Sequence, residues 1–280
     1  MTVFLVPNAQ KPRAMPIAKA AAELLRQYGA NVLMEDCFKA SFAGQPVKFF
    51  PEEQAIAACD AIVTVGGDGT ILRIARRSLA DRKPILGINV GRLGFLATVE
   101  ADELHRLKRL VTGDYTLDRR SILEVRVGGT QQVQNALNEV VIGKAGVSKT
   151  IDMEIYCDGT LVNRYQGDGV IVATPTGSTA YSLSAGGPVL DARIAGLVVT
   201  PICAHSMHSP PMVFSAQRRL RVTVSSAQPQ QVLYSCDGQA ETPLSDSDTV
   251  EVALSDQYMT LICLHDADQF EAIDKKLKGR

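Results

Sequence analysis

The sequence predicts an α/β amino-terminal domain with a doubly wound parallel sheet, followed by a mostly antiparallel all-β carboxyl-terminal domain. Up to about residue 117, short apolar runs alternate with segments whose apolar residues recur every three or four positions. This alternation is typical of strands joined by helices. After residue 117, most apolar residues instead alternate one by one with polar residues, which is typical of half-buried antiparallel strands.

In the first domain, the helix after Pro16 is the best-marked element. Its apolar residues share one face, Pro16 suits its first turn, and Gly29 suits its end. We expect strands at 3–6, 31–34, 61–65 and 84–90, and helices at 17–28, 52–59, 71–80 and 101–112. This first domain is expected to span residues 1–117.

In the second domain, expected to span residues 118–265, turn signals separate the alternating runs. Asp158-Gly159 lies between two such runs and predicts a tight hairpin, and Asp237-Gly238 follows another run. We expect strands at 122–127, 151–157, 161–165, 220–224, 231–236 and 250–254, and a last helix at 266–278.

Composition excludes several classes of protein. The 280 residues are 46% hydrophobic and 21% charged, as in a soluble globular protein. The net charge of −1 provides no field that would attract nucleic acid or an anionic membrane, and no apolar window is long enough to span a bilayer. The six cysteines show no Cys-x-x-Cys spacing, and no histidine has a carboxylate at metal-ligand spacing. We therefore expect a cytoplasmic protein without metal-ligating residues, nucleic-acid partner or membrane partner.

A glycine-rich loop follows directly on the expected strand 61–65. In Gly66-Gly67-Asp68-Gly69, three glycines allow the backbone to approach a phosphate closely, and the fourth residue is a carboxylate. At the carboxyl end of a parallel strand, Asp68 could accept a proton from a hydroxyl group or help to hold a metal ion. The alternative is a turn in which Asp68 only caps the following helix.

The stretch 167–188 is the most informative part of the chain. The apolar run 170–173 predicts a buried strand that breaks at Thr174-Pro175, and Gly177 is expected to turn the chain with a positive φ. Four hydroxyl residues then lie where a following helix would leave its first N–H groups unpaired: Thr174, Thr176, Ser178 and Thr179. This junction is predicted to offer N–H groups and hydroxyls to an anionic or hydroxyl-rich ligand. The alternative is a well-capped helix without a ligand.

Asn138-Glu139 are two adjacent polar residues between apolar neighbours. Adjacent side chains of a strand face opposite ways, so both could line one pocket only at the end of a strand. An amide can read the edge of a base, and a carboxylate can accept hydrogen bonds from ribose hydroxyls. The alternative is a polar strand terminus.

Taken together, these segments resemble the NAD kinase family. The loop 66–69, the pair Asn138-Glu139, the stretch 168–188 and the Cys-Asp-Gly-Gln turn at 236–239 occur in family order, and the resemblance spans nearly the whole chain. It implies that phosphate is transferred from ATP to the 2′-hydroxyl of the adenosine ribose of NAD, with Mg²⁺ arriving with ATP. It also implies that the last helix packs on the first domain, and that the β domains assemble a homo-oligomer, a tetramer.

The resemblance also implies residue roles, with Asp68 as the catalytic base and Tyr181 stacked on a ring. Gln166 stands where family members that also use polyphosphate tend to have glycine, so it favours ATP. The resemblance implies that the following residues contact NAD or ATP: Asp68, Gly69, Arg73, Phe95, Asn138, Glu139, Lys149, Gln166, Asp168, Thr179, Ala180, Tyr181, Ser182, Leu183, Ser184 and Gln239.

Two other functions stay open at this point. One is a lipid kinase of the diacylglycerol type, which shares the Gly-Gly-Asp-Gly-Thr loop but does not explain residues 174–184. The other is a non-catalytic NAD-binding sensor, against which the retention of Asp68 in an intact loop argues.

Overall fold

The computed structural model describes residues 1–91, 94–128, 133–146, 149–206, 209–225, 232–245, 248–264 and 273–274. The chain forms two compact units. Unit 1 contains Met1–Arg119 and the described residues from Met259 onward, and unit 2 contains Arg120–Tyr258. Two long strands, β7 (Thr116–Val127) and β18 (Thr249–Cys263), contribute residues to both units.

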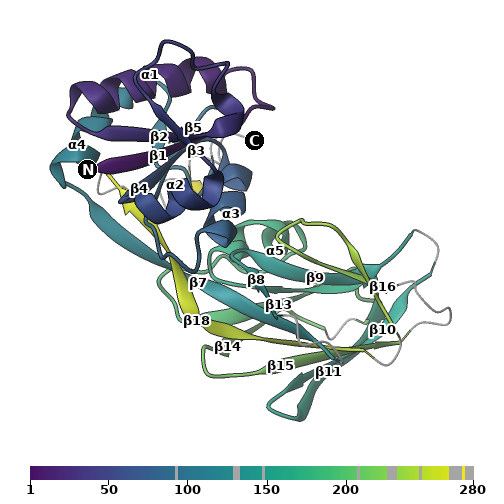
Figure 1. Cartoon of the computed structure of the whole chain (residues 1–280). Coiled ribbons are helices and arrows are strands. Elements are labelled where there is room, and N and C mark those ends of the chain that lie inside the picture. Colours follow the sequence, from purple (N-terminus) through teal and green to yellow (C-terminus); the bar gives the residue numbers. More distant parts are fainter. Residues whose placement is uncertain are drawn as a thin grey trace. The chain divides into compact units, whose positions relative to one another are not determined.

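Unit 1 is built on a parallel sheet in the order β3-β2-β1-β4-β5, with the end of β18 beside β5. Helices cover both of its faces, α1 and α4 on one and α2 and α3 on the other (Figure 1). This arrangement confirms the predicted doubly wound sheet. Its elements are β1 (Thr2–Pro7), α1 (Ala14–Gln27), β2 (Asn31–Glu35), β3 (Lys48–Phe50), α2 (Glu52–Ala58), β4 (Ala61–Gly66), α3 (Asp68–Arg77), β5 (Ile85–Asn89), β6 (Val99–Glu100) and α4 (Leu107–Thr112), with 3₁₀ turns η1 (Asp36–Phe38) and η2 (Leu104–Arg106).

The core of unit 1 explains why its strands are almost continuously apolar. All six residues of β4 are buried, because helices cover both faces of the sheet. Pro16 lies in the first turn of α1, and Gly29 ends the helix with φ +94°.

Two helices differ from the prediction. α3 begins at Asp68 rather than residue 71, since an acidic residue is favourable in a first helical turn. The expected helix 101–112 is a 3₁₀ turn followed by the short α4.

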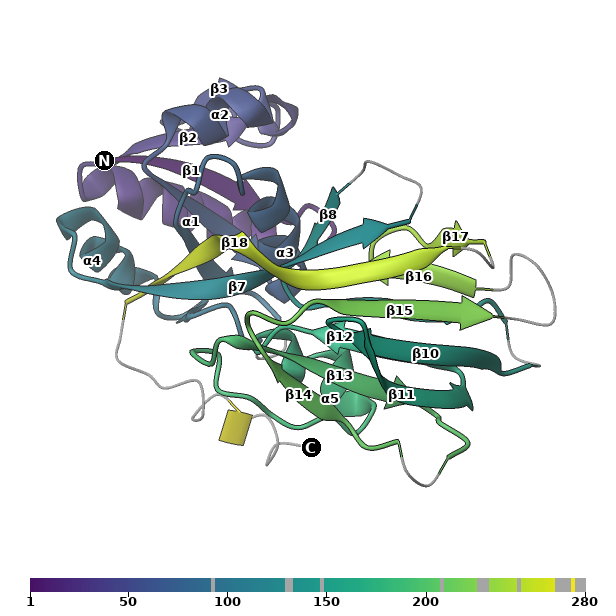
Figure 2. The same ribbon diagram turned by 90° about the horizontal axis from the view of Figure 1, so that it is seen from below.

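Unit 2 consists of two mostly antiparallel sheets, as predicted. One has the order β8-β7-β18-β15-β10-β11 and the other β14-β13-β12-β9-β16-β17. The row of β7, β18, β15, β10 and β11 can be followed in Figure 2. The remaining elements are β8 (Val133–Ala136), β9 (Glu139–Lys144), β10 (Ile151–Cys157), β11 (Thr160–Gly167), β12 (Gly169–Ala173), η3 (Gly177–Thr179), α5 (Tyr181–Ser184), β13 (Gly196–Ile202), β14 (Met212–Ser215), β15 (Leu220–Ser225), β16 (Val232–Cys236) and β17 (Thr242–Leu244).

The β10–β11 hairpin closes as its sequence predicts. Asp158 and Gly159 both have positive φ, +48° and +86°, which is the requirement of a type I′ turn. Inward-facing residues of both sheets, such as Met153, Val172 and Val222, are fully buried in one cluster. That cluster supports β9 and β12, whose ends carry the candidate site.

Of the expected last helix at 266–278, all but Ile273 and Asp274 lie outside the described residues. Within the described part of the chain, no helix has the length and apolarity needed to cross a membrane.

Candidate active site

In unit 1, the glycine-rich loop lies between β4 and α3, at the carboxyl edge of the parallel sheet. Gly67 is the N-cap of α3, and the N-cap position has no side-chain hydrogen bond. A Cβ on Gly66 would stand 2.2 Å from Thr70 Oγ1, so the chain can fold tightly only with glycine there. Beside Gly69, in contrast, a Cβ would meet no atom within 4 Å. The loop therefore presents open backbone at a helix start, a geometry suited to phosphate.

The Asp68 carboxylate is held by three backbone N–H groups of the segment after β5. Phe95 N donates to Oδ2 at 2.8 Å, and Leu96 N and Ala97 N donate to Oδ1 at 3.2 and 3.4 Å. A Cβ on Gly94 would stand 2.2 Å from Oδ1, which explains the glycine at that position. From the described residues, Oδ2 accepts one backbone hydrogen bond, so it retains lone-pair capacity for a further donor such as a substrate hydroxyl.

Two other predicted residues lie in unit 1. Arg73, on α3, forms an ion pair with Glu52 at 2.9 Å, and Arg77 contacts the same carboxylate. The guanidinium of Arg73 therefore already has a partner, and its predicted contact with phosphate would have to compete with Glu52. Phe95 is half-buried next to Asp68.

In unit 2, the Asn138-Glu139 pair lies where β9 begins, at the end of a strand, as it must if both side chains are to line one pocket. The Asp237 carboxylate binds the backbone here: N–H groups of Leu137, Asn138 and Glu139 donate to it at 2.8, 2.7 and 3.2 Å. From the other side, Thr174 N donates to Asn138 O at 2.8 Å. The pair is thus fixed by two segments that lie far away in the sequence.

Glu139 is the most unusual ionisable group of unit 2. The residue is only 8% exposed, and Oε2 has no hydrogen-bond partner among the described residues. Burial, together with the charge of Asp237, raises the pKa of Glu139 to about 7, although a hydrogen bond from the Tyr181 backbone N–H works in the opposite direction. A buried carboxylate oxygen without a donor is costly unless a ligand supplies one.

The stretch after β12 folds differently from the prediction. The hydroxyl groups expected to face a ligand mostly donate to the backbone of the protein: Thr174 Oγ1 donates to Leu137 O at 2.6 Å and Ser178 Oγ donates to Pro175 O at 2.6 Å. Thr179 Oγ1 likewise donates to Thr176 O at 3.1 Å. Instead of a long helix, the 3₁₀ turn η3 and the four-residue α5 follow. The predicted strand, turn and helix therefore follow one another with a shorter helix, and three of the four hydroxyl residues donate to backbone carbonyls.

Gly177 is required for a reason other than the one predicted. Its φ is not among the positive values of the chain. A Cβ at this position would stand 2.0 Å from Asn138 O and 2.8 Å from Asn138 Cα. Close approach of two backbones, rather than a left-handed turn, demands glycine here.

The other predicted residues of unit 2 lie around these two segments. Tyr181 is 45% exposed, so its ring is not part of the core, whereas Ser182 is buried and its hydroxyl bonds Thr200 at 2.8 Å. Ser184 is exposed, and Thr179, Ala180 and Leu183 are half-buried.

Asp168 forms an ion pair with Lys144 at 2.6 Å. Gln166 is exposed and donates to Asp152 at 3.2 Å. Lys149 and Gln239 are both exposed, Lys149 beyond β9 and Gln239 just after the Asp237-Gly238 turn.

Sequence reasoning missed Asp237 and Lys144 as individual residues. Asp237 lies inside the Cys-Asp-Gly-Gln turn, of which the family resemblance implies only Gln239 as a contact. The sequence Asp237-Gly238 predicts a turn, in which Gly238 indeed has a positive φ. It does not indicate that the Asp237 carboxylate binds the backbone of a segment far away in the sequence. Lys144 carried no signal, because its pairing with Asp168 depends on the antiparallel register of β9 and β12.

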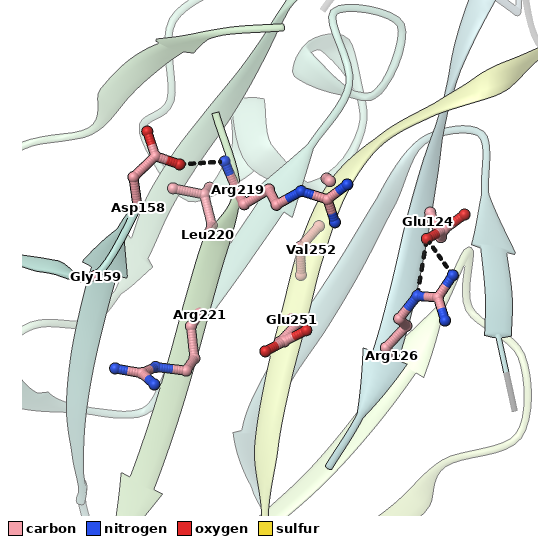
Figure 3. Close-up of a pocket in the computed structure, with 10 residues that line it drawn as sticks. Glu124, Arg126, Asp158, Gly159, Arg219, Leu220, Arg221, Glu251 and Val252 are labelled. Carbon is pink, nitrogen blue, oxygen red and sulfur yellow. Dashed lines mark hydrogen bonds and ion pairs between the residues drawn. The ribbon is translucent and has the colours of Figure 1, made fainter. Parts of the chain in front are cut away.

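A surface hollow of unit 2 lies away from these residues, on the sheet that contains β7, β15 and β18 (Figure 3). Some of the charged side chains that line this hollow have hydrogen-bond or ion-pair partners within the protein. Glu124 pairs with Arg126 at 2.8 Å, and the Asp158 carboxylate accepts the backbone N–H of Arg219 at 3.0 Å. None of the predicted contact residues lines this hollow.

Among the described residues, no three His, Cys, Asp or Glu side chains lie close enough to hold a metal ion.

A glycine-rich loop that carries a carboxylate at the carboxyl edge of a parallel sheet is typical of nucleotide-binding enzymes of the phosphotransferase class. The sequence matches the ATP-NAD kinase N-terminal domain over residues 3–115 and the ATP-NAD kinase C-terminal domain over residues 137–264. The chain belongs to the NAD kinase family.

Individual relatives agree with this assignment. An NAD kinase of Symbiobacterium thermophilum is 39% identical over 98% of both chains. The crystal structure of an NAD kinase from Archaeoglobus fulgidus in complex with ATP has a TM-score of 0.78 at 27% identity, over 100% of both chains. Yeast NADH kinase complexed with NADH shares the fold with a TM-score of 0.88 at 24% identity, over 99% of this chain and 87% of that one. The chain is thus a kinase acting on NAD, and neither a lipid kinase nor a non-catalytic sensor is favoured.

Proposed function

We propose that this chain transfers the terminal phosphate of ATP to the 2′-hydroxyl of the adenosine ribose of NAD through the residues described above. Residues 1–117, with 266–278 packed on them, would form the α/β domain carrying the Gly-Gly-Asp-Gly loop, and 118–265 the NAD-binding domain. Asp68 Oδ2 accepts the proton of the 2′-hydroxyl, the hydroxyl oxygen bonds to the γ-phosphorus, and the bond to ADP breaks. Bound together with ATP, Mg²⁺ would supply neutralisation of charge on the phosphates.

One observation supports the proposed NAD site most directly: Glu139 Oε2 is a buried carboxylate oxygen without a hydrogen-bond donor among the described residues. A ribose hydroxyl supplies such a donor, and Asn138, held beside Glu139 by Asp237 and Thr174, offers an amide to the adenine edge. The backbone of Tyr181 bonds Glu139, and its side chain is exposed, so an aromatic residue begins beside the same group. The Archaeoglobus fulgidus relative in complex with ATP supports ATP as donor, and the yeast structure with NADH supports a dinucleotide acceptor.

The direct test is to incubate the chain with NAD, ATP and Mg²⁺ and to analyse the product by mass spectrometry. We expect NAD carrying one additional phosphate on the adenosine ribose. A parallel reaction with diacylglycerol should give no phosphorylated lipid. Phosphorylated lipid without NADP, or NAD binding without turnover, would overturn the proposal.

We expect NAD to bind more tightly as the pH rises through 7. Ribose hydroxyls donate to the ionised form of Glu139, and burial with the charge of Asp237 raises the pKa of this group to about 7 in the free protein. The ionised, binding-competent fraction therefore grows between pH 6 and pH 8, which corresponds to a gain in affinity of about tenfold. Calorimetry in two buffers should also detect a proton released on binding near pH 6.

Two variants control this experiment. Glu139→Gln should bind NAD weakly and without the pH dependence. Asp237→Asn removes a negative charge next to Glu139, so the midpoint should move to lower pH. NAD affinity of the unmodified chain that stays constant from pH 6 to pH 8 would contradict the role of Glu139.

We further propose that the chain assembles into a homotetramer through its β-rich unit. Edge strands of both sheets carry exposed apolar side chains: Leu161 and Val162 on β11 and Val213 on β14. An exposed apolar edge strand is a template for pairing with another chain. Light scattering should give four times the mass of the chain at micromolar concentration. Val213→Asp is expected to lower that mass, and a monomeric unmodified chain would refute the proposal.

A further inference from the structure

Lys11 lies in the segment that joins β1 to α1, and this segment is tied to the glycine-rich loop. Asn8 N donates to Val65 O at 2.9 Å, and Asn8 Nδ2 donates to Thr70 Oγ1 at 3.2 Å. Lys11 N then donates to Asn8 O at 3.0 Å, so the position of its backbone follows from the same contacts. The chain is thereby fixed to both sides of the loop 66–69 before α1 begins.

The Lys11 ammonium lies directly against two glycine loops. Its Nζ is 2.7 Å from the place where a Cβ on Gly67 would stand, and 3.3 Å from the corresponding place at Gly91. These glycines follow β4 and β5, two neighbouring parallel strands. Any larger residue at position 67 would displace the ammonium. The absence of side chains at both positions keeps space for Lys11 at the carboxyl edge of the sheet.

Lys11 differs from the other half-buried lysines of the described chain because its ammonium has no partner among the described residues. Lys144, 17% exposed, pairs with Asp168, and Lys83 donates to two backbone carbonyls at 3.1 and 2.7 Å. Lys11 is half-buried, yet no ion pair or side-chain hydrogen bond to a described residue is formed by its ammonium. The nearby Asp68 carboxylate instead accepts three backbone N–H groups. A partly desolvated cation without a partner favours an anionic ligand.

We infer that Lys11 binds the phosphate chain of the donor, ATP, over the glycine-rich loop. Lysine serves as a point charge for phosphate, and the first N–H groups of the ten-residue α3 provide further donors beside it. Phosphate could also come from the diphosphate of NAD. The donor is the better match, because Lys11 lies on the loop that carries Asp68, toward which the transferred phosphate must be directed. This inference rests on the proposed ATP-dependent reaction.

The test compares Lys11→Met, Lys11→Arg and a control, Lys48→Met, in the full-length protein. Lys48 is an exposed lysine of unit 1 on β3, so its replacement removes the same charge away from the loop. We expect the KM for ATP of Lys11→Met to rise by at least about tenfold while the KM for NAD changes less than about twofold. Lys11→Arg should recover most of the loss, and Lys48→Met should behave as the unmodified chain.

Inorganic tripolyphosphate provides a readout that does not depend on turnover. Its binding, measured by calorimetry, should weaken in Lys11→Met and not in Lys48→Met. An unchanged KM for ATP, or a larger rise in the KM for NAD than for ATP, would overturn the inference. A loss of affinity for both ATP and NAD in Lys11→Met, together with a lowered melting temperature, would also overturn the inference. If the unmodified chain forms no NADP, the proposed function fails, but the tripolyphosphate comparison still decides the role of Lys11.

Discussion

Asp68→Asn is expected to lower the rate of NADP formation by ~10²–10⁴-fold, the usual contribution of a general base. The asparagine amide cannot take the proton of the 2′-hydroxyl. In addition, its NH₂ group would face a backbone N–H that now donates to the carboxylate, so at least one of three hydrogen bonds is lost. NAD affinity should stay close to that of the unmodified chain. Rapid-quench turnover and calorimetric titration with NAD measure the two effects separately.

Asp60→Asn is the matched control for this substitution. Asp60 belongs to the same unit, and its carboxylate also accepts a backbone N–H, that of Thr2 at 2.7 Å, but it lies just before β4 rather than after it. This variant should retain full turnover. Turnover near the normal rate in Asp68→Asn would eliminate Asp68 as the base, and a loss of only a few-fold would make it a residue that positions the loop at 95–97.

Gly177→Ala is expected to weaken NAD binding by about 5- to 150-fold, equivalent to the ~1–3 kcal/mol typical of overpacking. The added Cβ would stand 2.0 Å from the carbonyl oxygen of Asn138, so the backbone of the Asn138-Glu139 pair must move. Because the glycine-rich loop belongs to the other unit, ATP affinity should change much less. Titration calorimetry with each nucleotide, on variant protein shown to be folded, measures both affinities.

Gly143→Ala offers the same substitution in the same unit without the clash. Its Cβ would meet Asp168 O at 3.4 Å, an ordinary van der Waals distance. We expect NAD binding close to normal in this control. If Gly177→Ala bound NAD equally well, the turn after β12 would serve only to close the strand, and the nucleotide would have to bind elsewhere.

Much of the fold could be predicted from local pattern. The apolar runs of β1 and β4, the amphipathic α1 and the Asp158-Gly159 hairpin each depend on residues close in sequence, and each forms nearly where expected. The short elements after Thr174 could not be predicted in the same way. Hydroxyl residues favour helix starts in general. Here, however, Ser178 donates to the backbone inside the turn, and Thr174 donates to Leu137 O, in a segment far away in the sequence.

The polar residues of the candidate site were recognisable from the sequence, whereas their supports were not. Asp68 and Glu139 stand at strand ends, where ligands bind. The groups that hold the Asn138-Glu139 turn come from Asp237, 100 residues from Leu137, and the charge next to the glycine loop comes from Lys11, before the first helix. A single sequence carries no signal for pairings across such distances, because they depend on sheet order and register.

The long strand β18 has a consequence for how this chain can be made and divided. Its first part supplies Val250 and Val252 to the core of unit 2, while Ile262 near its end and Leu264 just after it join the core of unit 1. During synthesis on the ribosome, neither core is complete until residues 249–264 have emerged. A gene cut after residue 119 would therefore yield a first fragment in which β6 still pairs with the end of β5, but Ile85 lacks the neighbour that Leu261 provides. To rebuild unit 1 as a separate module, an engineer would have to graft the final strand back beside β5.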